Sequence, residues 1–166
     1  MDYIVDEMTY EYWGQVSKIY LEGIQTGKAT FQTTAPSWEE WNKGHLSSCR
    51  LVFRNEDEVL GWAALSPTSN RCVYQGVAEV SIYIGEKYRG QGIGRMLLGK
   101  VIDLSEKNGL WTLQSGIIRE NTSSIKLHKK CGFREIGIRE KVAKMGNGDW
   151  HDVVLMERRS KTVGID

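Results

Sequence analysis

The chain has 166 residues, of which 40% are hydrophobic and 26% are charged, a composition typical of one globular domain and unlike that of a disordered chain. Lys and Arg together number 22 and Asp and Glu 21, and the net charge of +1 gives no support to broad electrostatic binding of nucleic acid or membranes. Three cysteines and three histidines lack metal-ligand spacing, so we expect no metal site.

The amino-terminal half predicts two helices followed by a β-hairpin. Residues 11–26 carry an apolar helical face formed by Tyr12, Val16, Ile19 and Tyr20. A capping-box pattern at Ser37 predicts the start of a second helix. Two apolar runs, Leu51–Arg54 and Val59–Leu65, are joined by a turn-forming sequence and predict the hairpin. The acidic terminus Met1–Glu7 lacks the layout of a signal peptide, which favours a cytoplasmic protein.

The second half predicts strands that alternate with helices. One helix extends from Ile93 to a stop at Gly109, and a shorter helix ends at Lys130 before Gly132. The predicted strands are Val77–Ile84, Leu110–Ile118, Phe133–Ile138 and Asp152–Met156. This order predicts an α/β fold, with a mixed sheet whose crossovers surround a central parallel pair.

The segment Arg89–Arg95 has glycine at every second position and leads from a strand directly into a helix. Glycine permits close backbone approach, and the first amides of a helix have no partner within it, so the segment predicts a site for phosphate or pyrophosphate. It is not a Walker A loop, because no Gly-Lys-Ser/Thr follows. Nor does it fit a dinucleotide fold, because no acidic residue ends a strand about 20 residues later. A tight turn is the alternative interpretation.

Two motifs resemble the GNAT superfamily of acetyl-CoA-dependent N-acetyltransferases. Arg89–Gly94 is similar to its R/Q-x-x-G-x-G/A signature, and Asn121–Phe133 to its second motif, N-x-x-S-x-x-L-(Y/H)-x-x-x-G-F. Both occur in the expected order, one strand apart. Further details resemble the phosphinothricin and methionine sulfoximine acetyltransferase branch: the strand Val77–Ile84, His128, Thr30-Phe31 and Gly148–Asp152.

The resemblance implies the GNAT fold, with a mostly antiparallel sheet in which the strands Val77–Ile84 and Leu110–Ile117 splay apart. The pantetheine arm of acetyl-CoA would lie in the gap like an added strand. Its pyrophosphate would bind the amides of the glycine loop, and Asn121 would bond to the arm, with Ser124 nearby. The cofactor residues implied are Ile82, Tyr83, Ile84, Arg89, Gly90, Gln91, Gly92, Ile93, Gly94, Arg95, Asn121 and Ser124.

Two residues are the catalytic candidates. Attack on a thioester needs a neutral amine, a stabilised oxyanion and a protonated leaving thiol. The resemblance marks Glu79 as the general base, directly or through water, near the Ile82 amide that would bind the oxyanion. A solvated glutamate or an ion-pair partner is the alternative. His128 is a candidate general acid for the thiolate, because imidazole titrates near neutrality, or it packs beside the cofactor.

Four residues are candidates for the amine pocket: Phe31, Arg71, Tyr74 and Trp150. Aromatic side chains can form the pocket wall, although Phe31 and Trp150 fit a structural core equally well. Arg71 can hold a carboxylate or phosphinate by paired hydrogen bonds, and it therefore predicts an acceptor that carries an acidic group.

The sequence thus predicts a single N-acetyltransferase domain over residues 1–166, acting on the primary amine of a small amino-acid analogue such as phosphinothricin or methionine sulfoximine. Relatives imply a homodimer. One rival function is acetylation of a protein N-terminus, a polyamine or an antibiotic. Another is an acyl-CoA sensor without turnover, which would need neither Glu79 nor His128.

Overall fold

The computed structural model describes residues 2–166. Seven strands form one sheet in the order β1-β2-β3-β4-β5-β7-β6, in which β4 and β5 are parallel and every other pair is antiparallel. The strands are β1 (Ile4–Glu7), β2 (Leu51–Arg54), β3 (Val59–Pro67), β4 (Val77–Ile84), β5 (Thr112–Ile118), β6 (Arg134–Lys144) and β7 (Trp150–Arg159). The expected mixed sheet with one central parallel pair is confirmed.

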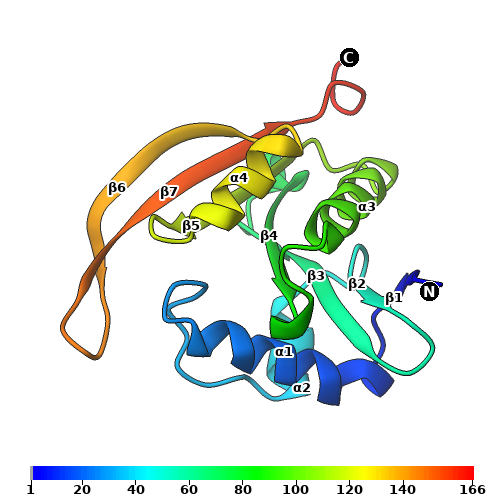
Figure 1. Ribbon diagram of the computed structural model, residues 1–166. Helices are drawn as coiled ribbons and strands as arrows, with labels where there is room; N and C mark the ends of the chain where they lie inside the picture. The colour runs from blue at the N-terminus through cyan, green and yellow to red at the C-terminus, as the bar shows by residue number, and fades with distance from the viewer. Residues whose placement is uncertain (1) are drawn as a thin grey trace.

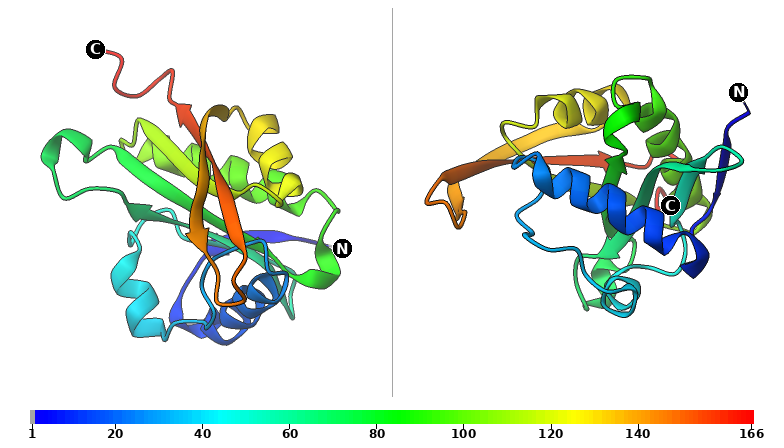
Figure 2. Two further views of the ribbon diagram at one scale, coloured as in Figure 1. Left: turned by 90° about the vertical axis from the view of Figure 1, so that its left-hand side faces the viewer. Right: turned by 60° about the horizontal axis from the view of Figure 1, so that its bottom comes forward.

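Helices cover both faces of this sheet (Figures 1 and 2). On one face lie α1 (Trp13–Gln25) and α2 (Trp38–Gly44), and on the other α3 (Ile93–Lys107) and α4 (Thr122–Lys130). Short 3-10 turns precede α1, interrupt the β3–β4 loop and follow β4, at Tyr10–Tyr12, Cys72–Tyr74 and Glu86–Tyr88. The Ser37 side chain accepts a hydrogen bond from the Glu40 amide, which confirms the predicted helix start at Ser37. The Glu40 carboxylate accepts from the Ser37 hydroxyl and not from its amide, so the reciprocal bond of a full capping box is replaced.

Two apolar clusters, one on each face of the sheet, anchor β4. Val80 belongs to the cluster under α3, with Leu97 and Val101. Tyr83 packs instead on the cluster under α1 and α2, beside the fully buried Trp62. The alternation of β4 therefore directs Glu79, Ser81 and Tyr83 toward α1 and α2, as the sequence pattern indicates.

The parallel strands β4 and β5 separate partway along their length. They pair at three positions, and the last pair is Glu79 with Gln114. Beyond it β4 continues to Ile84 and β5 to Ile118, without further pairing to each other. The splayed pair expected from the family resemblance is therefore present, and it opens immediately after Glu79.

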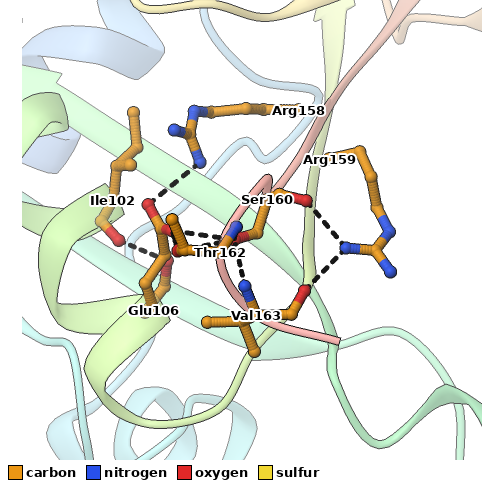
Figure 3. Close-up of polar contacts among 8 residues, drawn as sticks. Ile102, Glu106, Arg158, Arg159, Ser160, Thr162 and Val163 are labelled. Carbon is orange, nitrogen blue, oxygen red and sulfur yellow. Dashed lines mark hydrogen bonds and ion pairs between the residues drawn. The ribbon is translucent and has the colours of Figure 1, made fainter. Parts of the chain in front are cut away.

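The carboxyl-terminal tail folds back against the end of α3 (Figure 3). The Glu106 carboxylate accepts hydrogen bonds from the hydroxyls of Ser160 and Thr162 and from Arg158. Ser160 in turn accepts from the amides of Thr162 and Val163. These bonds hold the tail as an ordered turn.

Candidate active site

A cavity of about 610 Å³ opens where β4 and β5 diverge. One wall is the strand segment 80–83 and the opposite wall is the segment 115–118. The start of α4 closes one end, through Asn121, Ser124 and His128. The segment 29–36 between α1 and α2, together with Trp41 and His45, closes the other. An elongated ligand can therefore lie between the strands and meet a second molecule arriving from the α1–α2 side.

Glu79 lines this cavity at the point where the strands part. Its carboxylate makes no hydrogen bond or ion pair within residues 2–166, although the side chain is open to the cavity. The surrounding protein partly excludes water and raises the pKa of Glu79 above its usual range. A carboxylate in this state is a stronger base than a solvated glutamate and is available to hold an ammonium group or accept its proton.

His128 is 1% exposed at the inner end of the cavity. Its Nδ1 lies 2.7 Å from the Ser124 carbonyl oxygen, and that contact requires the proton to be on Nδ1. Nε2 is buried and has no partner within residues 2–166, so it carries a free lone pair. Burial also lowers the pKa of the ring. The neutral ring can therefore accept a hydrogen bond at Nε2, whereas the predicted general acid would have to donate a proton there.

The glycine loop lies at the end of β4, outside the cavity walls. Gly90 and Gly92 have φ angles of +76° and +83°, and a Cβ built on either would meet no atom within 4 Å. Among residues 2–166, no side chain caps the start of α3, so its first amides remain free toward this open space. The side chain of Arg89 donates a hydrogen bond to the Ile84 carbonyl oxygen at 3.3 Å and so ties the loop to the strand. The loop fits an oxyanion that approaches the backbone closely.

Asn121 caps α4 and faces the cavity. Its side-chain oxygen accepts from the Ser124 amide at 3.4 Å and from the Ser123 hydroxyl at 3.3 Å. The side-chain NH2 group makes no hydrogen bond within the described chain. It is therefore free to donate to a carbonyl oxygen of a ligand lying along β5.

Three candidates for the amine pocket lie away from the cavity walls, and Phe31 is the one that lines it. The Arg71 guanidinium lies 5.8 Å from the centre of the Tyr74 ring in the exposed β3–β4 loop. Trp150 is 54% exposed on β7, with the Lys144 ammonium group 5.5 Å from its ring. In this conformation the charge that Arg71 was expected to supply to the acceptor is outside the cavity.

Sequence analysis did not assign the side chains of Tyr20 and Tyr83 to the acceptor end of the cavity, and it noted Thr30 only through the resemblance of Thr30-Phe31 to the family branch. Tyr20 was interpreted as part of the apolar face of α1, and Tyr83 as a cofactor-binding residue of the strand Val77–Ile84. All three line the α1–α2 end. The sequence does hold a signal that could have placed Tyr83 in the cavity. Tyr83 shares a strand face with Glu79, because alternate residues of a strand point to the same side.

The site combines free amides that suit an anionic group, a gap between strands that suits an extended arm, and an unpaired carboxylate beside that gap. These features define a transferase that uses a phosphate-bearing acyl carrier. Comparison with known proteins supports this class. The sequence profile of the acetyltransferase (GNAT) family matches residues 12–133. The chain therefore belongs to this family, and it is an acetyl-CoA-dependent N-acetyltransferase.

Individual relatives extend the match over most of the chain. YwnH of Bacillus subtilis (strain 168) is 36% identical over 149 residues, covering 86% of this chain and 90% of YwnH. The L-methionine sulfoximine/L-methionine sulfone acetyltransferase of Salmonella typhimurium is 29% identical over 107 residues, covering 64% of this chain and 62% of that relative. The crystal structure of a phosphinothricin acetyltransferase from Sinorhizobium meliloti with acetyl-CoA is 27% identical, with a TM-score of 0.83, covering 100% of this chain and 97% of that one.

Proposed function

We propose that this enzyme acetylates the primary amine of a small amino-acid analogue of the phosphinothricin or methionine sulfoximine type. The observation that carries the proposal is the unpaired Glu79 carboxylate at the opening of the strands, because it can hold an amine next to a ligand lying in the gap. Relatives that act on such acceptors support the acceptor class. The cavity also suits a small acceptor, because residues of five different elements enclose it.

In the proposed mechanism, bound acetyl-CoA supplies an acetyl group activated as a thioester. The amides at the start of α3 hold the pyrophosphate, and the Asn121 NH2 group orients the pantetheine arm. Glu79 accepts a proton from the acceptor ammonium, directly or through water, so that the amine is neutral when it attacks. The amide of Ile82 stabilises the developing oxyanion. His128 can accept a hydrogen bond at Nε2 and so orient the reacting groups. The amine nitrogen loses its second proton as the C–S bond breaks, to the departing thiolate or to water, so the thiol needs no proton from the protein.

The test is acetyl transfer to a panel of amines, measured by release of free thiol. Methionine sulfoximine, methionine sulfone and phosphinothricin should be acetylated with higher kcat/KM than spermidine or an amino-terminal peptide. Equal or faster turnover of spermidine would contradict the acceptor class. Bound acetyl-CoA without turnover of any amine would support a sensor in place of an enzyme for small amines.

We also propose a homodimer. The edge strand β6 exposes Ile136, Ile138 and Val142, an apolar surface that a second copy can cover. Light scattering during size exclusion should give twice the 18.9 kDa mass of the chain. A mass of one chain at micromolar concentration would contradict this assembly.

A further inference from the structure

The sheet consists of two halves that meet along one short seam. Strands β1, β2, β3 and β4 form one half, and β5, β7 and β6 form the other. Within residues 2–166, backbone pairing between the halves is limited to the segment 77–79 with the segment 112–114. The cavity begins where this seam ends, with one wall on each half. The separation of the two halves therefore sets the width of the gap.

Trp111 reinforces the closed end of the seam, directly before β5. Its amide and the amide of Thr112 both donate to the Gly76 carbonyl oxygen, at 2.8 and 3.1 Å. The indole ring also lies against Gly76, so closely that a Cβ built on that residue would overlap the ring. This close approach requires glycine. The ring and the two hydrogen bonds fasten the start of β4 to the start of β5.

The carboxyl-terminal tail holds Trp111 from its other side. The Ser160 amide donates to the Trp111 carbonyl oxygen at 2.7 Å, and a Cβ built on Gly164 would lie 3.2 Å from the Cβ of Trp111. The Arg159 guanidinium closes the tail into a turn, because it donates at 2.8 Å to the carbonyl oxygens of Ser160 and Val163 (Figure 3). Trp111 is therefore enclosed between the start of β4 and an ordered tail.

The same tail joins the second half of the sheet to the helix that packs on the first half. Helix α3 packs on β2, β3 and β4. Near its end, the Glu106 carboxylate accepts hydrogen bonds from the hydroxyls of Ser160 and Thr162, which follow β7. Hydrogen bonds to a charged group are stronger than neutral ones. A rotation that opens the two halves would have to break these bonds as well as the seam.

We propose that Trp111 and residues 160–164, which we call the tail clamp, hold the two halves of the sheet at the separation that the pantetheine arm of acetyl-CoA requires. The proposal rests on the proposed function only in placing that arm between β4 and β5. A ligand that contacts both walls binds more tightly when their separation is already set, because less motion is lost on binding. The clamp lies outside the cavity, so Trp111 is a positioning residue.

Two changes release the clamp. A chain that ends at Ser160 loses the Thr162 bond to Glu106 and the contact of Gly164 with Trp111. Trp111→Ala removes the ring that lies against Gly76, whereas Trp111→Phe keeps an aromatic ring there and should restore most of the function. Lys161→Ala is the matched control. Lys161 is exposed in the same tail and makes no hydrogen bond or ion pair within residues 2–166.

Two ligands separate the gap from the glycine loop. Acetyl-CoA carries the pantetheine arm, and adenosine 3′-phosphate 5′-diphosphate carries the pyrophosphate without it. Calorimetry should give a Kd for acetyl-CoA that is about 5- to 20-fold higher in the shortened chain and in Trp111→Ala, and about threefold higher or less in Trp111→Phe. The Kd for the nucleotide should stay within about twofold in all of them. Lys161→Ala should bind both ligands as the wild type does.

Hydrogen exchange reports on the seam without any ligand. The amides of Trp111 and Thr112 should exchange at least about tenfold faster in the shortened chain, because the closed end of the seam opens more often. Thermal unfolding of each variant establishes that it is folded at the temperature of measurement. If Trp111→Ala does not fold, the shortened chain and Trp111→Phe decide the question.

Unchanged acetyl-CoA affinity in the folded shortened chain would overturn the proposal. An equal loss of affinity for both ligands would also overturn it, because a general loosening of the fold would then explain the effect. Unchanged hydrogen exchange at Trp111 and Thr112 would show that the tail does not hold the seam. Both measurements are made without an acceptor, so a failure to acetylate the panel of amines would contradict the proposed function and leave the tail clamp standing.

Discussion

Partial loss of water around a carboxylate that has no ionic partner or hydrogen bond disfavours its charged form. This raises the pKa of Glu79 at the site where the strands part. The side chain is exposed to the cavity and has no basic partner within residues 2–166, so its carboxylate is accessible to an ammonium group that enters the cavity.

Glu79→Gln should keep the size of the side chain and remove the basic oxygen. We expect kcat to fall by about 10²–10⁴, the usual contribution of a general base, with KM for acetyl-CoA unchanged. In the wild type, kcat/KM should fall as the pH drops through the raised pKa of Glu79, because the protonated carboxyl accepts no proton. The deficit of the variant should shrink at high pH, where more of the acceptor amine is neutral in solution.

The control for this change is Glu56→Gln, in the exposed β2–β3 turn outside the cavity. Its rates should equal those of the wild type. Steady-state rates across pH 5–10 on folded protein make the comparison. A Glu79→Gln enzyme within threefold of the wild type at neutral pH would remove Glu79 from the mechanism.

His128 gives a second prediction at this scale. Burial lowers the pKa of His128 from its ordinary 6.5, so the ring is mostly neutral at pH 7 and above. The kcat of the wild type should therefore show no decline between about pH 7 and 8 from loss of a histidine proton. His128→Gln can still donate to the Ser124 carbonyl oxygen, and it should lose less than about tenfold in kcat. A tenfold decline per pH unit above pH 6.5 that disappears in His128→Gln would restore the general acid.

Residues that belong to a family motif could be placed in the site from the sequence. Glu79, His128 and Asn121 all line one cavity, as the sequence implied. The proton position on His128 was not predictable, because it depends on the 2.7 Å approach of the Ser124 carbonyl oxygen. Arg71 was misleading because its residue type suits an acid, whereas the sequence does not reveal the direction of its side chain, which lies over the Tyr74 ring and outside the cavity.

At the scale of elements, the turn from β4 into α3 is set by backbone conformation. Gly92 occupies the left-handed region immediately before α3, and open space surrounds it. Gly92→Val would add a β-branched side chain where the pyrophosphate is expected and would strain the backbone as well. We expect the affinity for acetyl-CoA, measured by calorimetry, to fall at least about tenfold.

A matched variant separates the effect of backbone strain from the loss of the anion site. Gly148 has a φ of +92° in the β6–β7 turn and also meets open space. Gly148→Val should therefore show similar strain, with acetyl-CoA affinity close to that of the wild type. Unchanged affinity in a folded Gly92→Val protein, or an equal loss in both variants, would contradict the anion site.

The sequence predicted the elements with a strong apolar period and missed those without one. Both helices of the second half and the strand β4 were found, because their apolar residues repeat every 3.6 residues in the helices and every 2 residues in the strand. The edge strand β1 was missed, since its four residues include Asp6 and Glu7 and it pairs on one side only. The strands β6 and β7 are longer than predicted. Most of β6 is exposed and charged, so it lacks a burial pattern, and bulges interrupt its pairing.

At the scale of the whole molecule, the carboxyl-terminal tail ties the last strand to α3. Glu106 receives hydrogen bonds from Ser160, Thr162 and Arg158, and its side chain is about four-fifths covered. These bonds to the charged form hold the pKa of Glu106 below its ordinary value of 4.5. The tail also covers Trp111, since Gly164 lies against that ring. Trp111 donates its amide to the Gly76 carbonyl oxygen at the end of the β3–β4 loop.

Glu106→Gln should destabilise the protein at pH 7 by about 1–2 kcal/mol, because charge-assisted hydrogen bonds become neutral ones. This corresponds to a Tm lower by about 2–8 °C. A group whose pKa is lowered by folding contributes stability above its unfolded pKa and loses it as the pH falls through the folded pKa. The difference in stability between wild type and variant should therefore be complete above about pH 5, and it should close as the pH falls from 4.5 through the lowered pKa of the folded state. Asp103→Asn, exposed on the same helix without an ion pair, is the control and should leave Tm within about 1 °C. A gap that stays constant down to pH 3 would mean that Glu106 stabilises the tail by shape and not by charge.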